Sequence, residues 1–123
     1  MSLKPKKVQF ENEQPEFLRD AKNLEWTVGN ITLDSSKLAE GQVIKGGTAV
    51  FKNTESDLFE LVQASTPETM TAPVLTGHAV KIDDVQVNEQ VSALRKASVY
   101  EELLTGVTNN FKKATQGRIT FDV

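Results

Sequence analysis

The sequence predicts a mainly β fold, a small antiparallel domain with one or two short helices and an extended N-terminal arm. Two runs rich in β-branched residues, 74–82 and 91–99, flank the polar segment DDVQVNEQ. That linker is too short for a crossover helix but long enough for a wide hairpin, so we expect two antiparallel strands. Neither run has a purely apolar face, which is typical of half-buried strands or strands shared with a neighbouring chain.

The ends of the chain carry the other two observations. The last six residues, RITFDV, alternate apolar and polar side chains, which predicts a half-buried terminal strand whose removal destabilises the domain. Residues 1–22 contain Pro5, Pro15 and few apolar side chains, so they read as an arm. This arm is either a flexible terminus or a segment that adds to a partner's sheet edge, with Val8 and Phe10 on one side. We therefore divide the chain into an arm, 1–22, and a β-rich body, 23–123.

Short β-like pieces with turn signals fill the first half of the body. Residues 24–33 hold two such pieces around Gly29-Asn30, and Trp26 among them is expected to be a core or interface anchor. Asp34 and the serines after it are placed to cap a helical turn over residues 36–40. Gly46-Gly47 has the composition of a hairpin turn between two strands, and residues 58–63, LFELVQ, predict another strand.

One short helix is expected near the C-terminus. The segment NNFKKATQ places Phe111 and Ala114 on one face. We expect Asn109 or Asn110 to cap it and Gly117 to end it in a left-handed conformation.

Size and charge exclude several classes of protein. The chain has 123 residues, enough for one domain, and its hydrophobic share of 38% suggests that part of it orders against a partner. Its net charge is −3, whereas a duplex-binding module normally shows a basic patch, so we expect no direct nucleic-acid partner. No run approaches the roughly 18 apolar residues of a membrane span, and no apolar region follows the first lysines, so we expect a soluble protein without a signal peptide.

The residues of common active sites are sparse. The chain has no cysteine and one histidine, His78, which excludes thiol chemistry and a two-histidine metal site. Asp83-Asp84 lacks the spacing of a calcium loop, and no nucleophile elbow is present. The glycine spacing of residues 41–48 resembles a P-loop, but Gly47 stands where the essential lysine belongs. We predict a protein that is not an enzyme and has no cofactor or metal; a small hydrolase using His78 and a carboxylate is the enzymatic alternative.

The order of motifs in residues 40–123 resembles the lambda-like bacteriophage head decoration proteins. A glycine-rich stretch, Gly41-Gln42-Val43-Ile44-Lys45-Gly46-Gly47-Thr48, opens the body, and LFELV follows it. A Pro-Val-x-x-Gly segment then leads through D-V-x-V to the strand that carries Lys96-Ala-Ser-Val-Tyr100. Lys112-Lys113-Ala114 and Gly117-Arg118-Ile119-Thr120-Phe121 close the chain. His78 and Ala97 depart from the family pattern, which commonly has a hydrophobic residue and a glycine there.

The resemblance implies a β-clip-like domain that forms homotrimers at threefold sites on the outer surface of the virion capsid. Such a protein is made in the host cytoplasm and stabilises the expanded head against DNA pressure. Its partners would be the major capsid protein and further copies of itself. Capsid contacts are expected from the arm: Lys4, Pro5, Lys6, Lys7, Val8, Gln9, Phe10 and Phe17. Trp26, His78 and Tyr100 are expected to be trimer-interface or core anchors.

A different non-enzymatic reading is a receptor-binding or glycan-binding β domain on the virion surface. Such a domain usually presents a concave aromatic platform. The chain has one tryptophan and one tyrosine, which favours the decoration protein over this alternative.

Overall fold

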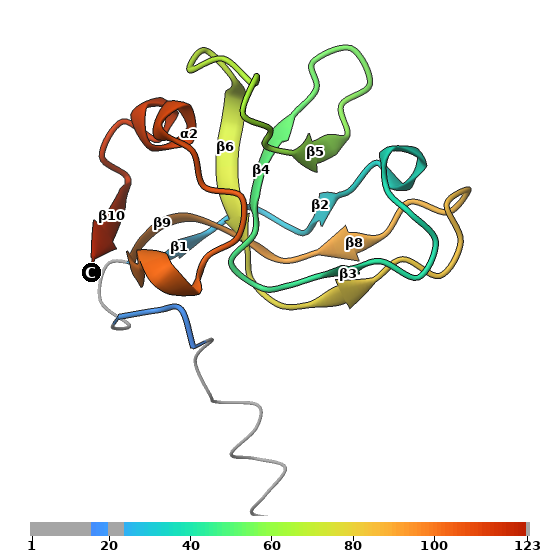
Figure 1. Ribbon diagram of the computed structural model, residues 1–123, viewed down its shortest axis with the longest axis horizontal. Helices are drawn as coiled ribbons and strands as arrows, with labels where there is room; N and C mark the ends of the chain where they lie inside the picture. The colour runs from blue at the N-terminus through green and yellow to red at the C-terminus, as the bar shows by residue number, and fades with distance from the viewer. Residues whose placement is uncertain (1–15, 20–23, 123) are drawn as a thin grey trace, which may run out of the picture.

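The computed structural model describes residues 16–19 and 24–122, and their fold is mainly β with short helical segments, as the sequence predicts (Figure 1). Its longest strands are β6 (Thr71–Thr76) and β9 (Ala93–Tyr100). These two pair antiparallel, with Leu75 opposite Leu94 and Thr76 opposite Ala93. The antiparallel pairing predicted for the runs 74–82 and 91–99 is therefore confirmed at residues 75–76 and 93–94. The linker 83–90 does not close a hairpin, however, because Val80–Lys81 and Gln90–Val91 pair with other strands.

A six-stranded sheet is built around β9 and β6. Its order is β1-β9-β6-β4-β5, where β1 is Glu25–Trp26, β4 is Ala49–Lys52 and β5 is Phe59–Leu61. The predicted terminal strand forms as β10 (Ile119–Asp122), which pairs with β9 in parallel. β9 is eight residues long, so its first half pairs with β1 and β6 while its second half pairs with β10.

Between β6 and β9 the chain makes an excursion that forms two small ribbons. β7 (Val80–Lys81) pairs with β3 (Val43–Ile44), and β8 (Gln90–Val91) pairs with β2 (Ile31–Thr32). The hairpin expected at Gly46-Gly47 is therefore wrong. The strands on either side of this turn, β3 and β4, do not pair with each other, because β3 pairs with β7 and β4 pairs with β5 and β6.

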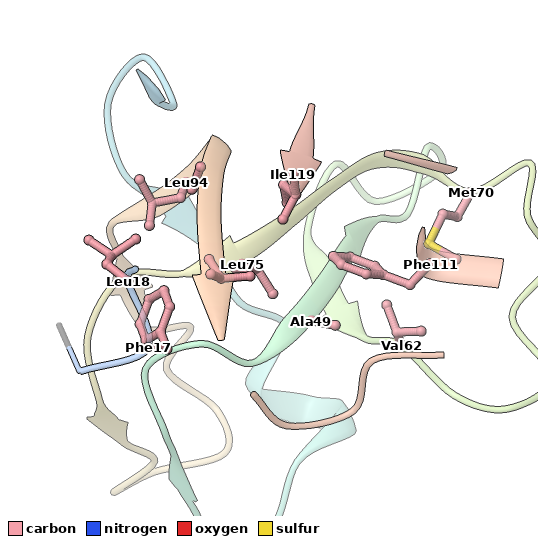
Figure 2. Close-up of a cluster of buried hydrophobic side chains, with 11 residues drawn as sticks. Phe17, Leu18, Ala49, Val62, Met70, Leu75, Leu94, Phe111 and Ile119 are labelled. Atoms are coloured by element: carbon pink, nitrogen blue, oxygen red, sulfur yellow. The ribbon is translucent and has the colours of Figure 1, made fainter. Parts of the chain in front are cut away.

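Two clusters of buried side chains lie on opposite sides of β6. We call them the helix-side core, shown in Figure 2, and the ribbon-side core. Leu75 belongs to the helix-side core and its neighbour Val74 to the ribbon-side core. Since successive residues of a strand point to opposite faces, β6 is buried on both faces near this point, not half-buried as expected.

Helix α2 (Asn109–Ala114) forms where a helix is predicted, and Phe111 is fully buried beneath it. Its cap is Thr108, whose hydroxyl accepts a hydrogen bond of 3.0 Å from the Phe111 amide, so the expectation of Asn109 or Asn110 is wrong. The sequence favours the asparagines over Thr108 because asparagine has the stronger cap preference. Gly117 has a φ of 82°, the left-handed conformation expected of it.

Two shorter helical segments complete the fold. η1 (Ser35–Lys37) follows its cap Asp34, whose carboxylate accepts a hydrogen bond of 3.1 Å from the Ser36 amide, as the capping prediction requires. The turn itself is shorter than the predicted 36–40 and starts one residue earlier. η2 (Glu101–Leu103) directly follows β9.

The described end of the predicted arm belongs to the body. Phe17 and Leu18 are 3% and 6% exposed and lie in the helix-side core (Figure 2). Leu18 forms an isolated antiparallel bridge with Val99. The expectation that Phe17 is an exposed capsid anchor is therefore wrong, because its ring fills space beside Gly47 and Leu104. Residues 16–19 thus pack with the body, although the sequence assigned them to the arm.

Candidate functional site

Trp26 and His78, two of the three candidate interface residues, lie close together around Gly77. The Trp26 ring lies directly over this glycine, and a Cβ atom built on Gly77 would overlap ring atom Cζ3. The same Cβ would lie 2.5 Å from the Ser92 hydroxyl. Trp26 is 45% exposed, so it is not a core residue, and the half of its surface that remains open is available to a partner. An interface role for Trp26 stays a prediction.

His78 is exposed and hydrogen-bonds through its ring. Its Nδ1 lies 2.8 Å from the Ser92 hydroxyl, and the Gly77 amide donates to the Ser92 carbonyl at 2.7 Å. Within the described ranges 16–19 and 24–122, no carboxylate contacts His78 to complete a triad. The same residues contain no group of three or more His, Cys, Asp or Glu side chains placed to hold a metal ion. What the geometry supplies is a half-exposed aromatic surface beside a hydrogen-bonded pair of polar side chains, His78 and Ser92.

Tyr100 lies apart from this surface, at the end of β9. Its amide donates a hydrogen bond of 2.8 Å to the Phe17 carbonyl, and it stands opposite Asp122 of β10. The Arg19 amide donates to the Ser98 carbonyl at 2.9 Å, so residues 17–19 follow β9 on the side away from β10. Tyr100 therefore marks the point where the N-terminal segment joins the body.

The remaining predicted capsid contacts lie outside the described residues. These are Lys4, Pro5, Lys6, Lys7, Val8, Gln9 and Phe10. What the structure does give is the position of Phe17, whose carbonyl accepts the hydrogen bond from the Tyr100 amide at the end of β9.

Sequence reasoning missed two further surface features. Val28 follows β1 and is fully exposed at 105%, although valine is usually buried. Beside it lies a pocket of about 380 Å³ that contains Arg95 and Arg118, which are distant in sequence. The sequence signal for this pocket was weak, because only the pairing of β9 with β10 brings the two arginines together.

In class, the protein is a small mainly β domain. No protein-family model, curated protein or solved structure matches the chain. In the part of the chain that the structure describes, no helix has the length and hydropathy of a bilayer span.

Proposed function

We propose that this protein is a capsid decoration protein, which binds the exterior of an expanded phage head as a homotrimer and stabilises it against internal pressure. The major capsid protein would be its main partner, and residues 1–15 would make the contact. Attachment would involve no covalent chemistry.

The observation that carries the proposal is the tether between residues 16–19 and β9. A segment that transmits force between two proteins must be fixed at both ends. On the body side, Phe17 and Leu18 are buried, and the main-chain hydrogen bonds at Phe17 and Arg19 measure 2.8 and 2.9 Å. Burying each side chain contributes about 1.5–3 kcal/mol and each hydrogen bond about 0.5–1.5 kcal/mol. The body end of the segment is thus attached through both side-chain burial and main-chain hydrogen bonds.

The proposal also rests on the resemblance in the motif order of residues 40–123. Parts of these motifs form β3, β5, β6, β9, α2 and β10, in that order along the chain, whereas residues 45–48 and 84–87 form turns between strands. Three arms on one trimer would then bind with high effective concentration, which converts weak single contacts into stable attachment.

The test is decoration of purified expanded shells by three forms of the protein: the full chain, a deletion of residues 1–15 and a matched variant in which Val8 and Phe10 are replaced by serine. The deletion ends before Phe17, so the body keeps its core and its fold is checked by circular dichroism. We expect stoichiometric binding at threefold sites for the full chain, none for the deletion and at least about tenfold weaker binding for the double-serine variant.

Two outcomes would contradict the proposal. One is that the full chain leaves expanded shells bare at micromolar concentration. The other is that the folded deletion still decorates them with unchanged affinity, which would leave the arm without its assigned role.

A further inference from the structure

The pocket beside Val28 combines an apolar wall with two guanidinium groups. Val28, Phe59, Ala72 and Val74 form the apolar part, from the loop after β1 and from β5 and β6, while Arg95 and Arg118 bring positive charge. Its volume of about 380 Å³ is within the range of small-ligand sites.

Arg118 is held in a fixed orientation by main-chain carbonyl groups. Its Nη1 donates to the Arg95 carbonyl at 2.7 Å and its Nη2 donates to the Pro73 carbonyl at 3.3 Å. The Pro73 carbonyl accepts this bond at an irregularity in the sheet. Val50 stands opposite Val74 but Lys52 stands opposite Thr71, so β6 carries an extra residue, and Ala72 there has a φ of 49°.

The charge of Arg118 is not neutralised within the described residues. Arg95 is paired with Glu25, whereas none of the ion pairs in residues 16–19 and 24–122 includes Arg118. Burial, and after it the nearby charge of Arg95, lowers the pKa of Arg118. Arginine nevertheless stays protonated in proteins, so a partly desolvated cation faces the pocket. A bound anion would offset both the burial of the Arg118 charge and its repulsion by the charge of Arg95.

We propose that this pocket binds a carboxylate carried next to an apolar group, supplied by an acidic side chain of a partner protein with an apolar residue beside it. The guanidinium of Arg118 would donate to the carboxylate, and Val28 and Phe59 would cover the apolar neighbour. A phosphate group matches this pocket less well, because Val28, Phe59, Ala72 and Val74 line much of its wall and would face charged oxygens instead of an apolar group. This inference goes beyond capsid attachment and does not depend on it.

The experiment is a nuclear magnetic resonance titration of the full-length protein with three probes. They are acetyl-Leu-Glu-amide, its isosteric control acetyl-Leu-Gln-amide, and inorganic phosphate. We expect the glutamate probe to shift the Arg118 Nε–H signal and the amides of residues 27–28 and 72–74. The glutamine probe should bind at least about tenfold more weakly, since it lacks the charge-assisted hydrogen bond.

Three variants test whether the glutamate probe binds in this pocket or is attracted by the positive charges of the protein in general. Val28→Asp places a carboxylate at the mouth of the pocket on a fully exposed residue, so the fold is retained and binding of the glutamate probe should be lost. Arg118→Gln should also lose binding. The matched control is Lys81→Gln, which removes an exposed cation on β7 away from the pocket and should leave binding unchanged.

Three results would overturn the proposal: equal binding of the glutamate and glutamine probes, phosphate binding at least as tight as the glutamate probe, or full binding by Val28→Asp. If Arg118→Gln does not fold, Val28→Asp alone decides the matter, because its substitution lies on the surface.

Discussion

The Trp26 indole ring occupies the space that a side chain at Gly77 would need. This relationship joins β1 to the start of the excursion after β6, and it places the only tryptophan of the chain on the surface beside His78. Gly77 is needed for close approach and not for an unusual backbone angle, since its φ lies outside the left-handed region.

Gly77→Ala is therefore expected to displace the Trp26 ring. Overpacking of this kind costs about 1–3 kcal/mol, and the free energy of unfolding should fall by that amount in urea titrations. Trp26 fluorescence should shift to longer wavelength as the ring moves into water. The control is a double-mutant cycle with Trp26→Ala: in that background Gly77→Ala should cost clearly less, and an equal cost would show that the ring is not the obstacle.

Phe17→Ala tests whether residues 16–19 belong to the body. Phe17 is 3% exposed in the helix-side core, so its truncation should lower the free energy of unfolding by about 3–5 kcal/mol. Val28→Ala, at a fully exposed valine, is the matched control and should change stability by less than about 0.5 kcal/mol. A loss below about 1 kcal/mol for Phe17→Ala would place residue 17 in a loosely attached arm after all.

Gly47 and Gly41 form a matched pair for separating backbone strain from packing. Both have a φ of 83°, so alanine at either position costs about 1–2 kcal/mol through the left-handed conformation. At Gly47 a new Cβ would also lie 3.0 Å from the Phe17 ring and 3.1 Å from Leu104, whereas at Gly41 nothing lies within 4 Å. We expect Gly47→Ala to be the more destabilising of the two in chemical denaturation, and equal effects would contradict the packing assigned to Phe17.

Thr108→Ala removes the cap of α2. Loss of the hydrogen bond from the Phe111 amide should lower the free energy of unfolding by about 1 kcal/mol. Asn109→Ala, one residue later and exposed, is the control and should have little effect. The reverse order of the two effects, measured by thermal unfolding, would restore the sequence-based assignment of the cap to an asparagine.

The candidate residues illustrate which contacts the sequence could anticipate. The sequence predicts Trp26 and His78 as anchors, but not their shared position at Gly77, because 52 residues separate them and no local pattern connects β1 with the segment after β6. The sequence places Phe17 in the arm because proline and charged residues surround it, and a single aromatic side chain among them does not predict a packed element.

The sequence by itself determined the type of most elements: the two long antiparallel strands β6 and β9, the strand at residues 59–61, the terminal strand and helix α2. Periodicity and capping depend on residues a few positions apart, so they can be recognised from the sequence alone. Only the tertiary structure decided which strands pair, which side of β9 receives residues 17–19, and that Arg95 and Arg118 share one pocket. Those outcomes depend on burying the most apolar surface across long sequence separations, and this competition among distant segments leaves no local pattern.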